Sequence, residues 1–142
     1  QRHRLAEVFA LSLVDRDPGA TEAQVADARE KAYRAPLLLV AIASLGSREP
    51  DTPALERMVS MGAAIQNLLL GAHAMGFGTG LTSGRAMASP HMRRLCGLND
   101  GEVAVCCVNV GTVGKRKVAS RVRPAATEIL SVLGPESRPG GA

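Results

Sequence analysis

The stretch LERMVSMGAAIQNLLLGAHAMGFGTGLTSG, residues 55–84, decides how the rest of the chain must be arranged. Between residues 58 and 75 no side chain carries a full charge, and many positions are glycine or alanine. A helix that is apolar all round is buried on all sides, in a large core, at a subunit interface or in lipid. The glycines behind it let the backbone approach a ligand closely, while Thr79, Thr82 and Ser83 add hydroxyl groups. The stretch therefore predicts a buried helix followed by a glycine loop at the rim of a cofactor pocket.

Length alone would allow this helix to cross a bilayer. At about 1.5 Å per residue, residues 58–75 span roughly 27 Å, which is close to the thickness of the hydrocarbon layer. However, Gln66 and Asn67 lie near the middle, His73 follows them, and no aromatic belt flanks the segment. We therefore expect a buried helix in a soluble protein, and no membrane partner.

Helix and strand patterns on either side of this stretch indicate an α+β or α/β sandwich. Apolar spacing, caps and prolines predict the other helices, at residues 2–14, 21–35, 89–96 and 125–133. Two apolar runs predict strands that are covered on both faces, at residues 37–45 and 102–110. Two strands are too few for a self-sufficient sheet. Further strands must come from a preceding part of the protein, from a partner subunit, or from a segment that the pattern misses.

The chain has 142 residues, the length of one domain. We expect this domain to span residues 1–133, with a flexible tail at residues 134–142. The N-terminus lacks the apolar core of a signal peptide. Cys96, Cys106 and Cys107 are odd in number, and the last two lie among valines, which favours reduced, buried thiols in a cytoplasmic protein.

The spacing of the polar residues shows no catalytic or metal-binding constellation. His3, His73 and His91 are far from one another, and neighbouring cysteines on a strand point to opposite faces. The glycine segment lacks the third glycine of a dinucleotide fingerprint and the Gly-Lys-Ser/Thr ending of a phosphate loop. We therefore assign no catalytic residue and no metal ligand, and an enzyme of this kind would take its chemistry from a cofactor.

Positive charge is concentrated near the C-terminus, in a chain whose net charge is +4. The basic side chains of this cluster are Lys115, Arg116, Lys117, Arg121 and Arg123. Such a cluster attracts nucleic acid, acidic lipid or the phosphate of a small cofactor, and is otherwise a solvated tail. Aromatic residues make up only 2% of the chain, too few for a base-stacking surface, so we do not expect a nucleic-acid partner.

The order of these motifs resembles that of the nitroreductase family. The shared features are KAYRAPL at residues 31–37, the apolar strand, QN at 66–67 in the small-residue helix, and the run from GFG at 76–78 to TSG at 82–84. SP at 89–90, CGL at 96–98 and the strand that ends in GT at 111–112 continue the match in the same order. The similarity covers roughly residues 2–124 and is closest to a small bacterial branch of NAD(P)H-dependent flavin enzymes.

The resemblance implies an α+β fold, with a nitroreductase-like mixed sheet flanked by helices and the long central helix buried at a homodimer interface. It implies FMN as the cofactor and NAD(P)H as co-substrate, with hydride passing through FMN to a nitroaromatic, a quinone or a similar small-molecule acceptor. By their match to family positions, Leu81, Thr82 and Ser83 line the flavin. Arg121 and Arg123 match a basic pattern that contacts the flavin phosphate, and forked guanidinium donors suit a phosphate dianion.

Two departures from the family pattern leave alternatives open. Family members begin with an Arg-Ser-x-Arg-like helix and a loop that covers the flavin from the partner subunit, and this sequence starts after both. Leu81 stands where close relatives often carry Trp, which removes a stacking surface. The alternative is a non-catalytic dimeric binding module on the same scaffold, and a weaker one is a nucleic-acid binder that uses residues 115–123.

Overall fold

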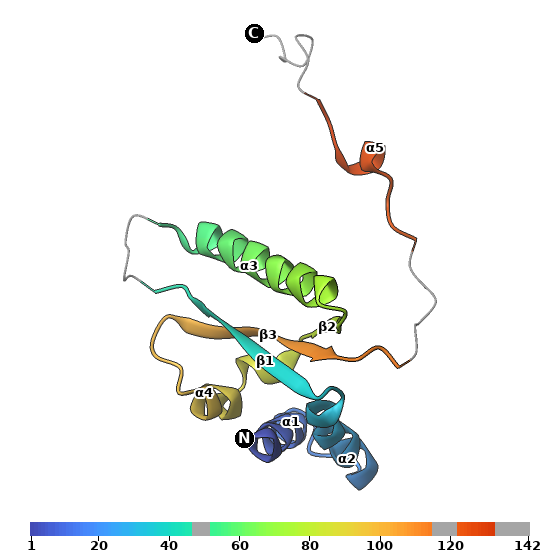
Figure 1. Ribbon diagram of the computed structural model, residues 1–142. Coiled ribbons are helices and arrows are strands. Elements are labelled where there is room, and N and C mark those ends of the chain that lie inside the picture. The colour runs from blue at the N-terminus through green and yellow to red at the C-terminus, as the bar shows by residue number, and fades with distance from the viewer. Residues whose placement is uncertain (47–51, 115–121, 133–142) are drawn as a thin grey trace.

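Three strands form one antiparallel sheet in the computed structural model, which describes residues 1–46, 52–114 and 122–132 (Figure 1). The strands are β1 (Leu37–Ser44), β2 (Gly78–Thr82) and β3 (Glu102–Gly111). Their order is β1-β3-β2, and β3 pairs antiparallel with both neighbours. The two outer strands therefore keep one open edge each within the described sheet.

Helices cover both faces of this sheet. On one face lie α1 (Arg2–Val14), α2 (Glu22–Glu30), α4 (Pro90–Cys96) and the short 3-10 helices η1 (Lys31–Tyr33) and η2 (Arg85–Ala88). The other face is crossed by α3 (Ala54–Ala74) (Figure 1). This arrangement confirms the α+β class that the sequence predicts.

Alternation along β3 divides the core into two clusters, because successive side chains of a strand point to opposite faces. Cys107 packs with Leu5, Val8 and Met92 on the side of α1 and α4. Its neighbours Cys106 and Val108 belong to the cluster that meets α3 on the other side. The central strand thus holds both layers of the fold together.

Local signals in the sequence set several helix ends as expected. The hydroxyl oxygen of Thr21 accepts the Gln24 N–H at 3.3 Å, and the Gln24 side chain accepts the Thr21 N–H at 2.8 Å, a complete capping box. Ser89 caps α4 by accepting the Met92 N–H at 3.1 Å, with proline at the first helical position. Gly97 ends α4 in the left-handed conformation, at φ 62°.

The glycine segment after α3 is a strand and not the loop that we predicted. Residues 78–82 pair with β3 as β2, and only the preceding Gly76, at φ 84°, takes a left-handed turn. Glycine is needed at position 78 for a different reason, since a Cβ there would collide with the Val113 side chain. The loop prediction was wrong because β3 supplies a hydrogen-bonding ladder beside residues 78–82.

No residue of α3 is buried in the single chain, contrary to the all-round burial that its composition predicts. Leu55, Val59 and Leu70 are 76%, 68% and 55% exposed. Only one side of the helix, around Ile65 and Leu69, packs on the sheet. A covering layer for the other side is therefore not supplied by the described residues.

Two smaller predictions also need correction. The first strand, expected to be covered on both faces, leaves Leu37 and Leu39 partly exposed because α3 shields it incompletely. The helix expected at residues 125–133 is reduced to α5 (Ala126–Ile129), on a segment that runs away from the sheet (Figure 1). The tail at residues 134–142 lies outside the described residues. Among the described helices none has the length and hydropathy required to span a bilayer.

Candidate functional site

A cavity of about 440 Å³ opens on the α1 side of the sheet, where β2 ends. Its walls come from the C-terminal half of α1, from Lys31 and Arg34 around η1, from the end of β2 and from η2. The predicted flavin-lining residues Leu81, Thr82 and Ser83 all border it. The structure therefore places this part of the predicted site at a real concavity.

The hydroxyl of Thr82 is oriented by a neighbouring strand. The Asn109 side-chain amide on β3 donates to Thr82 Oγ1 at 3.1 Å and to the Gly80 carbonyl at 3.3 Å. A hydroxyl that accepts in this way keeps its own proton available to a ligand. Thr82 also pairs with Cys107, which places its side chain on the cavity face of the sheet.

Asn109 is a residue of the site that we did not predict. Its Oδ1 atom is buried and has no hydrogen-bond partner among the described residues. The sequence held a signal, because Asn109 is the one amide in an otherwise apolar run, residues 103–110. A polar side chain in the middle of a buried strand is costly unless it serves a hydrogen-bonding role.

Ser83 and Leu81 offer the cavity mainly their backbone groups, because their side chains are engaged elsewhere. The Ser83 hydroxyl donates to the Val105 carbonyl at 2.9 Å, so it fastens the end of β2 to β3. Leu81 lies opposite Val108, whose side chain belongs to the α3 side, so alternation directs the Leu81 side chain the same way. Because β2 is an edge strand, its outer N–H and C=O groups have no strand partner in the described sheet.

The floor of the cavity includes a buried thiol. Cys107 is 1% exposed, and burial first, then the neighbouring Cys106 and Cys96, raises its pKa to about 11. The group is therefore a neutral thiol near pH 7 and a poor nucleophile. The structure confirms free cysteines, with Cys106 and Cys107 buried and Cys96 partly buried. The described residues contain no group of three or more His, Cys, Asp or Glu side chains that could hold a metal ion.

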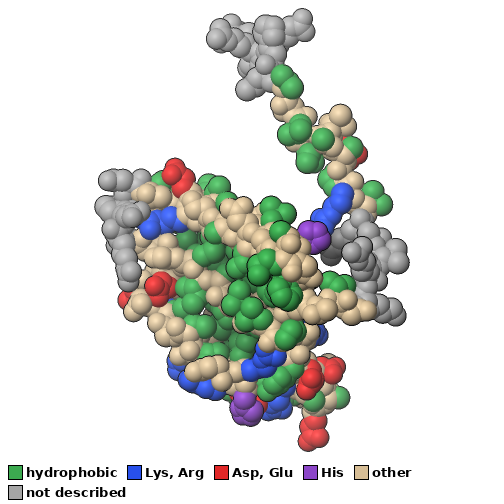
Figure 2. All heavy atoms as spheres, in the orientation of Figure 1, with side chains coloured by type: hydrophobic (Ala, Val, Ile, Leu, Met, Phe, Trp, Pro, Cys, Tyr) green, Lys and Arg blue, Asp and Glu red, His purple; other side chains and the backbone are tan. Residues whose placement is uncertain are grey.

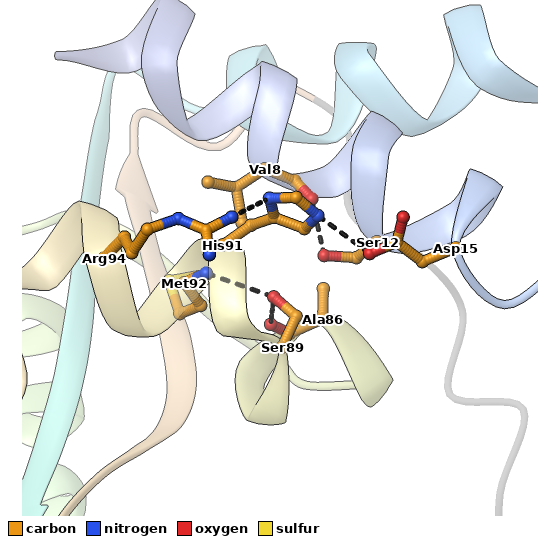
Figure 3. A network of polar contacts seen from close by, with 8 residues as sticks. All are labelled: Val8, Ser12, Asp15, Ala86, Ser89, His91, Met92 and Arg94. Carbon is orange, nitrogen blue, oxygen red and sulfur yellow. Dashed lines mark hydrogen bonds and ion pairs between the residues drawn. The ribbon is translucent and has the colours of Figure 1, made fainter.

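A network of polar contacts joins residues of α1, η2 and α4 (Figure 3). His91 Nε2 lies 2.8 Å from Asp15 Oδ2, and an Arg94 guanidinium nitrogen lies 2.7 Å from His91 Nδ1. Since Arg94 only donates, Nδ1 accepts and the Nε2–H group donates to Asp15. This contact ties α4 to the end of α1, whose Ser12 lines the cavity. The histidine has a structural role, as its isolation in the sequence suggested.

Of the two predicted phosphate-binding arginines, the structure describes only Arg123. Arg121 lies outside the described residues. Arg123 is exposed, does not line the cavity, and belongs to the C-terminal segment that runs away from the sheet (Figure 1). Most of the predicted basic cluster, at residues 115–121, likewise lies outside the described part of the chain.

A second, apolar groove of about 560 Å³ runs between α3 and the sheet. Leu37 and Leu39 of β1 line it together with Leu68 of α3 and with Met75 and Phe77, which follow α3. Figure 2 shows hydrophobic side chains gathered on this side of the molecule, below α3. Apolar surface of this kind marks an interaction site more often than a chemical one.

Comparison with known proteins places these features in a family. Residues 1–112 match the family model described as "Nitroreductase family". A Haemophilus influenzae protein described as "Putative NAD(P)H nitroreductase" is 27% identical over 126 residues, which cover 89% of this chain and 67% of that protein.

Two solved structures share the fold. A nitroreductase-like family protein from Bacillus cereus superposes with a TM-score of 0.71 at 21% identity, covering 93% of this chain and 67% of the other. A mutant of an FMN and NADPH-dependent nitroreductase from sphigopyxis sp. strain HMH gives a TM-score of 0.55 at 21% identity, covering 90% of this chain and 56% of the other. The chain thus spans only part of the length of these proteins.

Proposed function

Because this chain belongs to the nitroreductase family, we propose that it acts as an FMN-dependent NAD(P)H oxidoreductase. The acceptor would be a nitroaromatic, a quinone or a similar small molecule. The observation that carries the proposal is the cavity at the end of β2, which Leu81, Thr82 and Ser83 line. The descriptions of the Haemophilus influenzae protein and of the sphigopyxis structure support the same chemistry.

The residues present at the cavity suit a flavin ring. Phe9, Leu13 and Met87 provide apolar walls for the benzenoid side of an isoalloxazine. The open edge of β2 and the oriented hydroxyl of Thr82 provide hydrogen-bonding groups for its pyrimidine side. At Gly84 no heavy atom lies within 4 Å of the position of a Cβ, so a planar ligand has room to approach the backbone.

When bound, FMN supplies the two-electron chemistry between the nicotinamide and the acceptor, and the chain supplies binding and orientation. Thr82 would donate its hydroxyl proton to an acceptor atom of the ring, held in place by Asn109. Ser83 would keep the edge of β2 at a fixed distance from the ring through its bond to Val105. We keep Arg121 and Arg123 as proposed contacts of the flavin phosphate.

We propose further that the protein is a homodimer built on α3. Val59, Ala63, Gln66 and Leu70 recur at helical spacing and form one exposed stripe, here called the outer stripe. It carries no charge, and its apolar members would remain in water in a lone chain. A second copy would cover it and could bring its own C-terminal segment, with Arg123, toward the cavity. Three unbridged thiols agree with the reducing cytoplasm as the compartment.

Titration with FMN tests the proposed activity directly. Purified protein should quench FMN fluorescence at a stoichiometry of one flavin per chain, and NADPH should bleach the bound flavin absorbance under anaerobic conditions. Thr82→Val removes the hydroxyl at nearly constant volume and should weaken FMN binding by about 1 kcal/mol. Thr79→Val is the matched control, because Thr79 lies on the same strand but does not line the cavity. A protein that takes up no FMN would refute the oxidoreductase and favour the binding module.

A further inference from the structure

Four basic side chains surround the cavity from elements that are distant in sequence. Arg16 follows α1, Lys31 and Arg34 lie at the two ends of η1, and Arg85 begins η2. Among the described residues that line the cavity, none has an acidic side chain. The concavity is therefore positively charged on several sides, although the chain as a whole carries only +4.

These four cations lack partners for their side chains among the described residues, whereas most of the other described arginines have one. Within the described part of the chain, none of the four side chains has an ion pair or a side-chain hydrogen bond. Elsewhere, Arg29 pairs with Glu7 at 2.8 Å and Arg93 with Asp100 at 2.9 Å. Like charges that share a concave wall repel one another, and an anionic ligand would relieve this repulsion.

We infer that this cavity recognises the phosphate groups of the nicotinamide dinucleotide and favours NADPH over NADH. The inference rests on the proposed function, which makes a nicotinamide dinucleotide the hydride donor at this cavity. The diphosphate of NADH carries about two negative charges, and the 2′-phosphate of NADPH adds nearly two more, as a phosphate monoester does near pH 7. The four unpaired cations therefore match the total phosphate charge of NADPH better than that of NADH.

The flavin phosphate alone does not account for the cluster. One monoester brings at most about two charges, and two forked guanidiniums would already satisfy its oxygens. Arg34 follows η1 and Arg85 begins η2, so these two charges come from separate elements, whereas a single phosphate group is compact. A ligand with phosphates at separate positions fits this distribution of charge better.

Calorimetric titration with NADP⁺ and NAD⁺ tests the inference without turnover. Both ligands are titrated into FMN-loaded and FMN-free protein, and FMN affinity is measured separately by fluorescence. The variant Arg34→Gln/Arg85→Gln removes two charges from the cavity. Arg93→Gln is the control for a lost exposed charge, because Arg93 lies on α4 and does not line the cavity.

We expect the unaltered chain to bind NADP⁺ more tightly than NAD⁺. The double variant should lose about five- to twentyfold in NADP⁺ affinity, since an exposed charged contact is worth up to about fivefold. NAD⁺ affinity should fall less, and Arg93→Gln should keep the preference.

Equal affinity for the two dinucleotides, or a preference that survives in the double variant, would overturn the inference. A weakened FMN affinity with an unchanged preference would also overturn it, because the cations would then hold the flavin phosphate, and the proposed function would stand. A chain that takes up no FMN but keeps a charge-dependent preference for NADP⁺ would refute the oxidoreductase and leave the dinucleotide site supported.

Discussion

Replacing Leu70 by alanine should weaken self-association without unfolding the chain. Leu70 lies on the outer stripe of α3, is 55% exposed and belongs to neither core cluster. The substitution therefore removes few of the contacts that stabilise the single chain. Alanine also has the best helix propensity, so α3 itself should not be weakened.

The size of the effect follows from the exposed fraction. Fully burying a leucine side chain is worth about 1.5–3 kcal/mol, and at Leu70 roughly half of that surface is open to a partner. In a two-fold symmetric dimer the same substitution occurs on both sides of the interface. We expect a total loss of about 1.5–3 kcal/mol in dimerisation free energy, which is a roughly 10- to 150-fold increase in the dissociation constant.

Sedimentation velocity over a dilution series measures this constant. Leu11→Ala is the matched control, because Leu11 is 43% exposed but lies on α1, across the sheet from α3. The control should dimerise as the unaltered chain does and keep its thermal midpoint, and Leu70→Ala should keep the far-UV circular dichroism of the folded chain. An unaltered chain that stays monomeric, or a Leu70→Ala variant with the original dissociation constant, would refute the assignment of the interface to α3.

Four further predictions concern stability and the flavin site. Asn109→Leu should change the free energy of urea unfolding by less than about 1 kcal/mol. The variant loses two hydrogen bonds, but it also removes a buried oxygen that has no partner among the described residues. A loss above about 3 kcal/mol would contradict this reasoning. His91→Ala should lower that free energy by about 1–2 kcal/mol through its contacts with α1 and α4, and an unaltered thermal midpoint would exclude the structural role. The raised pKa of Cys107 means that the folded chain keeps a proton that the unfolded chain releases, so stability should fall between about pH 8.5 and pH 11; in Cys107→Val this decline should be shallower. Arg123→Ala should weaken FMN binding by about 1.5–3 kcal/mol, and unchanged affinity would show that the residue is merely solvated.

The sequence predicts well the elements whose ends are set by local chemistry. The helix expected at residues 2–14 is α1, and the capping residues Thr21 and Ser89 accept hydrogen bonds from the N–H groups of Gln24 and Met92. These features depend on residues within one or two turns of each other. These hydrogen bonds form between neighbouring residues and do not depend on tertiary contacts.

The sequence fails where distant segments decide the outcome. Glycine-rich residues 78–82 have low strand propensity, and they form β2 because β3 supplies a ladder beside them. The four cations of the cavity come from positions 16, 31, 34 and 85, and no spacing rule relates them. The role of Asn109 likewise depends on the register between β2 and β3, which only the folded sheet fixes.

The uncharged helix and the cavity are parts of one continuous structure. Residues 75–77 alone separate the end of α3 from the start of β2, whose last residue, Thr82, borders the cavity. A partner that covers the outer stripe would therefore also fix the position of the strand edge offered to a ligand. Composition predicts that α3 is hidden from water but does not say by what, and the single chain leaves its outer stripe exposed. Formation of the dimer and formation of the flavin site should thus be coupled, and FMN affinity should fall in the same Leu70→Ala variant that dissociates.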